Sequence, residues 1–201
     1  MLLTCAGLAA HAAGTPDNGA FTPPPNRAGH SAWIPLRHQL QELNLCVPTS
    51  ASMILEYFGD SLSPREIKAL SRNQTYTPGD SFHDFTITFF RDLISGLARR
   101  GYAWREKDYP NSANGLKTGL ADIERSLDGG TPVMIDTSPG DGPHTFVVAG
   151  YSVADQELLA VDPVKPSPGL RIVRFATLDA VWNSREVGSN LRAAIFPKRR
   201  Q

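Results

Sequence analysis

The stretch IPLRHQLQELNLCVPTSASMILEYFG, residues 34–59, places a cysteine two residues before a proline typical of a helix start. Pro48 suits the first turn of a helix, because its φ is already helical and the first N–H groups of a helix have no partner within it. Gly59 is typical of a helix end. Apolar residues recur at helical spacing between them: Ala51, Met53, Ile54, Tyr57 and Phe58. The stretch therefore predicts an amphipathic helix with Cys46 at its start.

A cysteine in this position is suited to nucleophilic chemistry. The first N–H groups of a helix point toward such a side chain, and the helix dipole adds partial positive charge. Together with an imidazolium, this environment lowers the pKa of a thiol from about 8.5 to roughly 3–4. The chain contains only one other cysteine, Cys5. A single thiol kept in an exported protein is expected to be either buried and inert or chemically employed.

Export is expected from the first residues, MLLTCAGLAAHAAG, which are apolar and small and resemble a secretory leader over 1–13. This predicts a periplasmic or extracellular location. Two alternatives are a lipoprotein with its lipid on Cys5 and an N-terminus without a targeting signal. Residues 14–32 are rich in proline, glycine and polar residues, and predict a flexible lead-in. The folded domain is expected over 33–197, followed by a basic tail at 198–201.

Composition restricts the class of partner. The 201 residues suit one domain, and 20 basic against 20 acidic side chains give a net charge of zero. Binding to nucleic acid or anionic lipid needs clustered positive charge, so neither is expected. No apolar run approaches the roughly 20 residues of a membrane-spanning helix. The oligomeric state stays open.

The remaining pattern predicts an α+β fold, with a helical layer packed on an antiparallel sheet. Ser63, Pro64 and Glu66 form a capping-box start for a second helix. Further helices are expected at 85–100, 116–127 and 178–182. Short apolar segments that predict strands lie at 132–136, 145–153, 157–162, 170–175 and 192–196. A hairpin tip is expected at 155–156.

A general base for the thiol is sought among five histidines. His11 and His30 fall in the leader and the lead-in, and His83 lies in a polar loop. His38 is close to the thiol in sequence, but its neighbour Gln39 fits a defined role better. His144 follows the turn PGDGP and opens the apolar strand TFVVAGY, where a ring is held rigidly and still reachable.

Two further groups complete the candidate site. Asp162 ends the apolar run LLAV and precedes Pro163. In an antiparallel hairpin the end of one strand returns beside the start of its neighbour, so Asp162 can orient the ring of His144. An amide that stabilises the oxyanion can come from Gln39 or Gln41, both ahead of the cysteine. Taken singly, each residue also has an ordinary structural explanation; the case rests on their joint placement.

These motifs resemble those of papain-like cysteine peptidases of the bacteriocin-processing, double-glycine leader peptidase type. IPLRHQ is similar to the VPxxxQ segment of that family, and LCVPTSASMILEYFG to its CGPTS helix. GPHTFVVAGYS and LLAVDPV are similar to its histidine strand and its Asp-Pro segment. Val47 replaces the family's usual glycine after the nucleophile, and Pro143 precedes the histidine where glycine is common.

The resemblance implies a papain-like fold in which Cys46 is the nucleophile, His144 the base, Asp162 its orienting carboxylate and Gln39 the oxyanion amide. The implied activity is hydrolysis of peptide or amide bonds in a peptide or protein substrate, without a cofactor or a metal ion. A catalytically silent binding module and an acyl transferase using the same residues are the alternatives. Residues 73–85, NQTYTPGDSFHDF, are expected to form part of the substrate cleft.

Overall fold

The computed structural model describes residues 21–71, 87–138, 142–183 and 190–200. Its centre is a seven-stranded antiparallel sheet with the order β2-β7-β3-β4-β5-β6, and β1 also pairs with β4. The strands are β1 (Ser31–Trp33), β2 (Arg105–Pro110), β3 (Val133–Thr137), β4 (His144–Ser152), β5 (Glu157–Val161), β6 (Leu170–Arg174) and β7 (Leu191–Phe196). The helices are α1 (Cys46–Phe58), α2 (Pro64–Leu70), α3 (Phe90–Ala98), α4 (Ala113–Asp128) and α5 (Phe175–Val181).

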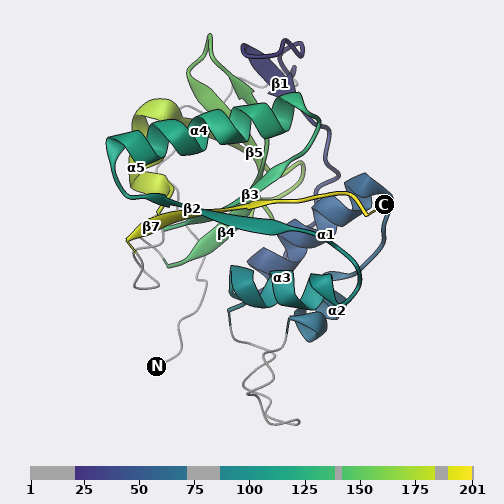
Figure 1. The fold of residues 1–201 in the computed structure, drawn as a ribbon. Coiled ribbons are helices and arrows are strands. Elements are labelled where there is room, and N and C mark those ends of the chain that lie inside the picture. The colour runs from purple at the N-terminus through teal and green to yellow at the C-terminus, as the bar shows by residue number, and fades with distance from the viewer. Residues whose placement is uncertain (1–20, 72–86, 139–141, 184–189, 201) are drawn as a thin grey trace.

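Helices cover both faces of this sheet (Figure 1). On one face, α1, α2 and α3 pack on side chains that include Val147 and Ala149 of β4. On the other, α4 and α5 pack on a second cluster that includes Phe146 and Val148. Successive side chains of a strand point to opposite faces, so β4 supplies both clusters and all of its residues are buried. The α+β class is confirmed, with a helical layer on each face.

Local sequence signals explain where the first helices begin and end. α1 starts at Cys46, two residues before Pro48, and ends at Gly59, whose φ of 92° is the left-handed conformation that glycine adopts easily. Ser63 and Glu66 form the expected capping box of α2. The cysteine is therefore the first residue of α1, and the helix begins two positions before the proline.

The three largest differences from the sequence-based predictions concern β2, β1 and α3, while α4 and α5 each start three residues earlier than predicted. β2 was missed because four of its six residues are exposed and charged, yet it pairs with β7 along its whole length as an edge strand. The first two residues of β1 lie in the predicted lead-in, where Asn26 binds the main chain of Trp33. The helix predicted at 85–100 is shorter, because residues 87–89 are not helical and α3 starts at Phe90.

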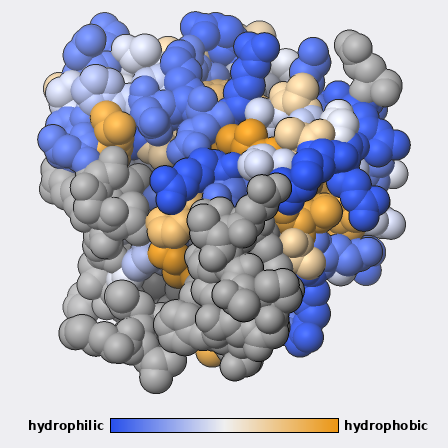
Figure 2. All heavy atoms as spheres, turned by 60° about the horizontal axis from the view of Figure 1, so that its bottom comes forward, coloured by the Kyte–Doolittle hydropathy of each residue, from blue (hydrophilic) through white to orange (hydrophobic). Residues whose placement is uncertain are grey.

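Some predictions lie outside the described residues: the leader at 1–13, the first part of the lead-in and the whole of the proposed cleft segment at 73–85. Within the described ranges, no helix has the length and apolar character needed to cross a membrane. The face shown in Figure 2 is largely hydrophilic where it is described, with hydrophobic residues in separate small patches.

Candidate active site

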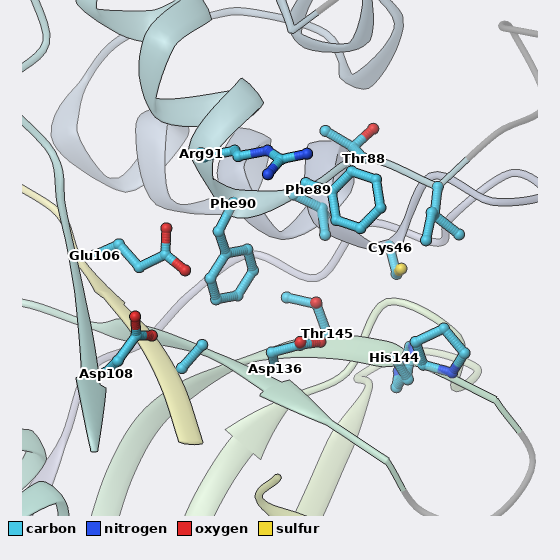
Figure 3. Close-up of a pocket in the computed structure, with 14 residues that line it drawn as sticks. Cys46, Thr88, Phe89, Phe90, Arg91, Glu106, Asp108, Asp136, His144 and Thr145 are labelled. Carbon is cyan, nitrogen blue, oxygen red and sulfur yellow. The ribbon is translucent and has the colours of Figure 1, made fainter. Parts of the chain in front are cut away.

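A cavity of about 560 Å³ opens where α1, the start of α3 and the strands β2, β3 and β4 meet. Cys46 and His144 both line it, although 98 residues separate them in the chain. Figure 3 shows them at one side of the cavity, Cys46 from α1 above and His144 from β4 below. Cys46 is 6% exposed and borders this open space, so its thiol is not sealed inside the apolar core.

The N-terminus of α1 is an electropositive environment for the Cys46 sulfur. Leu45 at the N-cap makes no side-chain hydrogen bond to the helix, and the first turn contains no acidic residue. The partial positive charge of the helix end is therefore not offset by a carboxylate of its own first turn. Such a position favours the thiolate over the neutral thiol.

One hydrogen bond fixes the helix of Cys46 to the strand of His144. Ser50, one turn after Cys46, donates its hydroxyl to the carbonyl oxygen of Thr145 at 3.3 Å. Thr145 follows His144 directly, and Thr137 of β3 donates to the carbonyl oxygen of His144 at 2.8 Å. These contacts hold the first residue of α1 and the first residue of β4 in a defined relation.

Asp162 lies directly behind His144. Its Oδ1 is 2.8 Å from His144 Nε2, and both side chains are buried, at 0% and 5% exposure. β4 and β5 are antiparallel, with Val147 opposite Val161, so the residue after β5 returns beside the first residue of β4. The predicted proximity of the two residues is observed.

The charge of Asp162 decides the tautomer of the neutral imidazole. Burial by itself raises the pKa of this carboxyl. The hydrogen bond and charge of His144, the Arg171 guanidinium and the Val164 N–H outweigh that effect and lower the pKa to about 2. An ionised carboxylate only accepts hydrogen bonds, so His144 Nε2 carries the proton that it donates. The neutral ring therefore has its basic nitrogen at Nδ1.

The structure does not bring Gln39 to the cavity. Its side-chain amide donates to Glu56 Oε2 at 2.8 Å. Glu56 lies ten residues after Cys46 on α1, about 15 Å farther along the helix axis. The resemblance-based choice of Gln39 as the oxyanion amide is therefore not supported, because hydrogen bonding to the far end of α1 fixes this side chain away from the sulfur.

Gln41 is the glutamine held beside Asp162, although neither glutamine lines the cavity. Its main-chain N–H donates to the carbonyl oxygen of Pro163 at 2.8 Å, and Pro163 follows Asp162. Its Oε1 is buried and has no hydrogen-bond partner. The segment before Cys46 is thus attached beside the carboxylate through Gln41.

Acidic side chains line the side of the cavity opposite Cys46. Glu106 and Asp108 extend from β2 on that side, and Asp136 of β3 lies between them and His144. Arg91 is the one permanent cation among the described lining residues. Loss of solvent and the neighbouring Asp108 raise the pKa of Glu106, and Arg91 partly opposes them. Phe89 and Phe90 lie between the acidic side and the cysteine in Figure 3.

Sequence reasoning missed two residues that contact Asp162. Arg171 of β6 donates from Nε to Asp162 Oδ2, and His38 Nε2 is 3.2 Å from the main-chain oxygen of Asp162. A charged residue in the short apolar strand LRIVR is the only sequence signal for Arg171, and it does not identify the partner. Among the described residues, no group of three potential metal ligands is assembled.

The sequence model of the Peptidase_C39 like family matches residues 32–189, most of the chain. The chain belongs to this family. The search of curated proteins gave no match.

Two solved structures share the fold of this C39-like domain. One is the peptidase domain of Streptococcus ComA, described as a bi-functional ABC transporter involved in a quorum sensing pathway. It has 16% identity and a TM-score of 0.53, and the alignment covers 81% of this chain and 98% of that one. The other is a double glycine motif protease from an AMS/PCAT transporter, solved in complex with the leader peptide. Its identity is 13% and its TM-score 0.55, with 83% and 95% of the two chains covered.

Proposed function

We propose that this C39-like domain is a thiol-dependent hydrolase that cleaves peptide bonds, with Cys46 as nucleophile, His144 as acid and base, and Asp162 as the carboxylate that orients His144. The proposal depends on one observation: Cys46 at the uncapped start of α1 and the Asp162-bound ring of His144 line the same cavity. The family and the peptide bound by one structural neighbour support a peptide as substrate.

In the first half-reaction the Cys46 thiolate attacks the carbonyl carbon of the scissile bond. A carbon–sulfur bond forms and the carbonyl π electrons move to oxygen, giving a tetrahedral oxyanion. When the oxyanion collapses, the carbon–nitrogen bond breaks. The leaving amine takes the proton that His144 carries on Nδ1, since Nε2 stays bonded to Asp162. The products are a free amine and a thioester on Cys46.

In the second half-reaction water attacks the thioester. Neutral His144 removes a proton from this water at Nδ1, and the carbon–sulfur bond breaks to release the acid and restore the thiolate. Ionised Asp162 stabilises the positive ring that forms in this step. The cycle consumes one water and needs no oxidant, reductant or metal ion.

Incubation with a mixed peptide library, followed by mass spectrometry, tests the proposal. We expect new N-termini that do not form after treatment with iodoacetamide, because the alkylated sulfur is no longer a nucleophile. Addition of a primary amine such as methylamine distinguishes hydrolysis from acyl transfer, since transfer appends the amine to the new C-terminus. Cleavage that persists in the alkylated protein contradicts the proposal.

The oxyanion amide is assigned within this proposal to Gln41 rather than Gln39. We expect Gln41→Ala to lower kcat by roughly 100-fold with little change in KM, since an oxyanion donor acts chiefly in the transition state. Gln39→Ala is the matched control, because its amide is bonded to Glu56, and it should change kcat less than about threefold. Steady-state kinetics on a cleaved peptide measure both. If kcat falls more in Gln39→Ala than in Gln41→Ala, the oxyanion amide is Gln39 instead.

The acidic side of the cavity predicts a preference for cationic peptides. For a pair of peptides that differ only by Lys or Glu near the scissile bond, we expect kcat/KM to favour Lys by roughly tenfold, or about 1.4 kcal/mol. The preference should weaken as the pH falls through the raised pKa of Glu106, which then becomes neutral.

Charge-neutral variants test this preference. Glu106→Gln combined with Asp108→Asn should remove most of it, because both carboxylates line the cavity. Glu124→Gln, a carboxylate on α4 and outside the cavity, is the matched control and should retain it. Equal kcat/KM for the Lys and Glu peptides in the unmodified protein would show that the acidic side of the cavity does not select the substrate.

A further inference from the structure

The carboxylate of Asp162 is held at both oxygens. Oδ1 accepts from His144 Nε2 at 2.8 Å and from the Val164 main-chain N–H at 3.0 Å. Oδ2 accepts from Arg171 Nε. The main-chain N–H of Asp162 donates to the Gly169 carbonyl oxygen at 2.8 Å. One oxygen is thus directed to the histidine and the other to the arginine, so the carboxylate cannot rotate without breaking an ionic contact.

Arg171 is itself fixed in this arrangement. Its side chain is 13% exposed, and its guanidinium lies over the ring of Phe146 at 5.4 Å from the centroid. A planar, permanently charged guanidinium can stack on a ring and donate to a carboxylate in one pose, which an ammonium cannot do. Phe146 also contacts the His144 ring, at 6.2 Å between centroids. Arg171 on β6 and His144 on β4 therefore approach Asp162 from the two strands on either side of β5.

We propose that Arg171 is a positioning residue of the active site: it directs one oxygen of Asp162 to His144 and limits how strongly the imidazole holds its second proton. This inference rests on the proposed function of Cys46 and His144. Arg171 does not line the cavity and is not assigned contact with substrate.

The positive charge of Arg171 beside Asp162 opposes a second positive charge on His144. A histidine facing a lone buried carboxylate is strongly stabilised as imidazolium, because the two charges attract in a medium of low dielectric constant. Here the carboxylate is already paired with the permanent charge of Arg171, which disfavours a second positive charge on the adjacent ring. A ring that loses its proton more easily is a better acid toward the leaving amine.

The other charged groups at Asp162 do not replace Arg171. His38 contacts only the main-chain oxygen of Asp162. Lys165 lies on the turn after β5; burial and repulsion by Arg171 lower its pKa, while the charge of Asp162 raises it. Cys46 lies on the same side of the cavity as His144 and carries no permanent positive charge. Removal of Arg171 should therefore leave Asp162 with His144 as its main cationic partner.

The test is an NMR titration of the ¹⁵N-labelled histidine rings in the whole chain, with the His144 signals assigned by comparison with His144→Gln. In Arg171→Met we expect the His144 midpoint to move to higher pH by roughly one unit. In Arg171→Lys the charge is retained and the midpoint should move by less than about 0.3 unit. Arg174→Met, an exposed arginine on the same strand, is the matched control and should leave it unchanged.

Activity separates this inference from the proposed function. We expect kcat to fall roughly 10-fold in Arg171→Met and less in Arg171→Lys, with the alkaline limb of kcat/KM moved to higher pH only in the first. If Arg171 is purely structural, Arg171→Met should lower the melting temperature but leave the His144 titration midpoint and the alkaline limb of kcat/KM unchanged. That result would overturn the inference. If Arg171→Met does not fold, Arg171→Gln is titrated with the same criteria. Absence of thiol reactivity in the unmodified protein would overturn the proposed function instead.

Discussion

Cys46→Ala is expected to reduce peptide cleavage by at least about a thousandfold, because no other group in the cavity can form the thioester on which both half-reactions depend. The residual rate should not depend on the presence of iodoacetamide. Initial rates on any peptide that the unmodified protein cleaves, followed by mass spectrometry, measure the loss.

Two controls separate lost chemistry from lost structure. Cys5→Ala removes the other cysteine of the chain, and should leave both cleavage and its inhibition by iodoacetamide unchanged. Thermal unfolding of Cys46→Ala should stay within a few degrees of the unmodified protein, because removal of one sulfur at the edge of a cavity is a small loss of packing. If Cys46→Ala still cleaves peptides at the original rate, the chain is not a cysteine peptidase acting through this site.

Asp162→Asn is expected to lower kcat by roughly 10²- to 10⁴-fold with the fold retained. The oxygen of the new amide can accept from His144 or from Arg171, but both approach as donors. Since Arg171 always carries its protons, it takes the oxygen. The amide NH₂ then faces His144 Nε2, which must become the unprotonated nitrogen. Nδ1 carries the proton instead, and the neutral ring can no longer act as a base toward the cavity.

The double variant Asp162→Asn with Arg171→Met tests this explanation. Without the guanidinium the amide can turn its oxygen to His144, so the double variant should be at least about fivefold faster than Asp162→Asn alone. Independent effects would instead multiply the two single losses, and a double-mutant cycle on kcat measures the difference. A double variant slower than both single variants would show that the arginine does not control the tautomer.

Much of the fold follows from local signals along the chain. Gly59 ends α1 because a left-handed residue is needed there, and Ser63 with Glu66 starts α2 through bonds that span three residues. The short apolar segments of the second half became β3 to β7 within one or two residues. Such features depend on neighbours in sequence, so they can be predicted without knowing what packs on them.

The features that the sequence did not predict depend on contacts between distant segments of the chain. β2 is a strand because β7 supplies its hydrogen bonds, while its own charged residues give no strand pattern. The sequence alone does not distinguish Gln39 from Gln41. In the structure Gln39 binds Glu56, away from the site, whereas Gln41 binds the main chain of Pro163, beside Asp162. Arg171 has meaning only once the hairpin of β5 and β6 brings it to Asp162.

The order of residues alone thus predicted Cys46 at the start of a helix, His144 at the start of a buried strand and Asp162 one hairpin away. Chain folding alone supplied the cavity, its acidic side, the choice between two glutamines and the arginine on the far side of the carboxylate. The physical reason is the separation along the chain of the groups that interact. Helix ends and turns are stabilised by groups a few residues apart, whereas the charge and orientation of a buried side chain depend on whatever distant segment is packed against it.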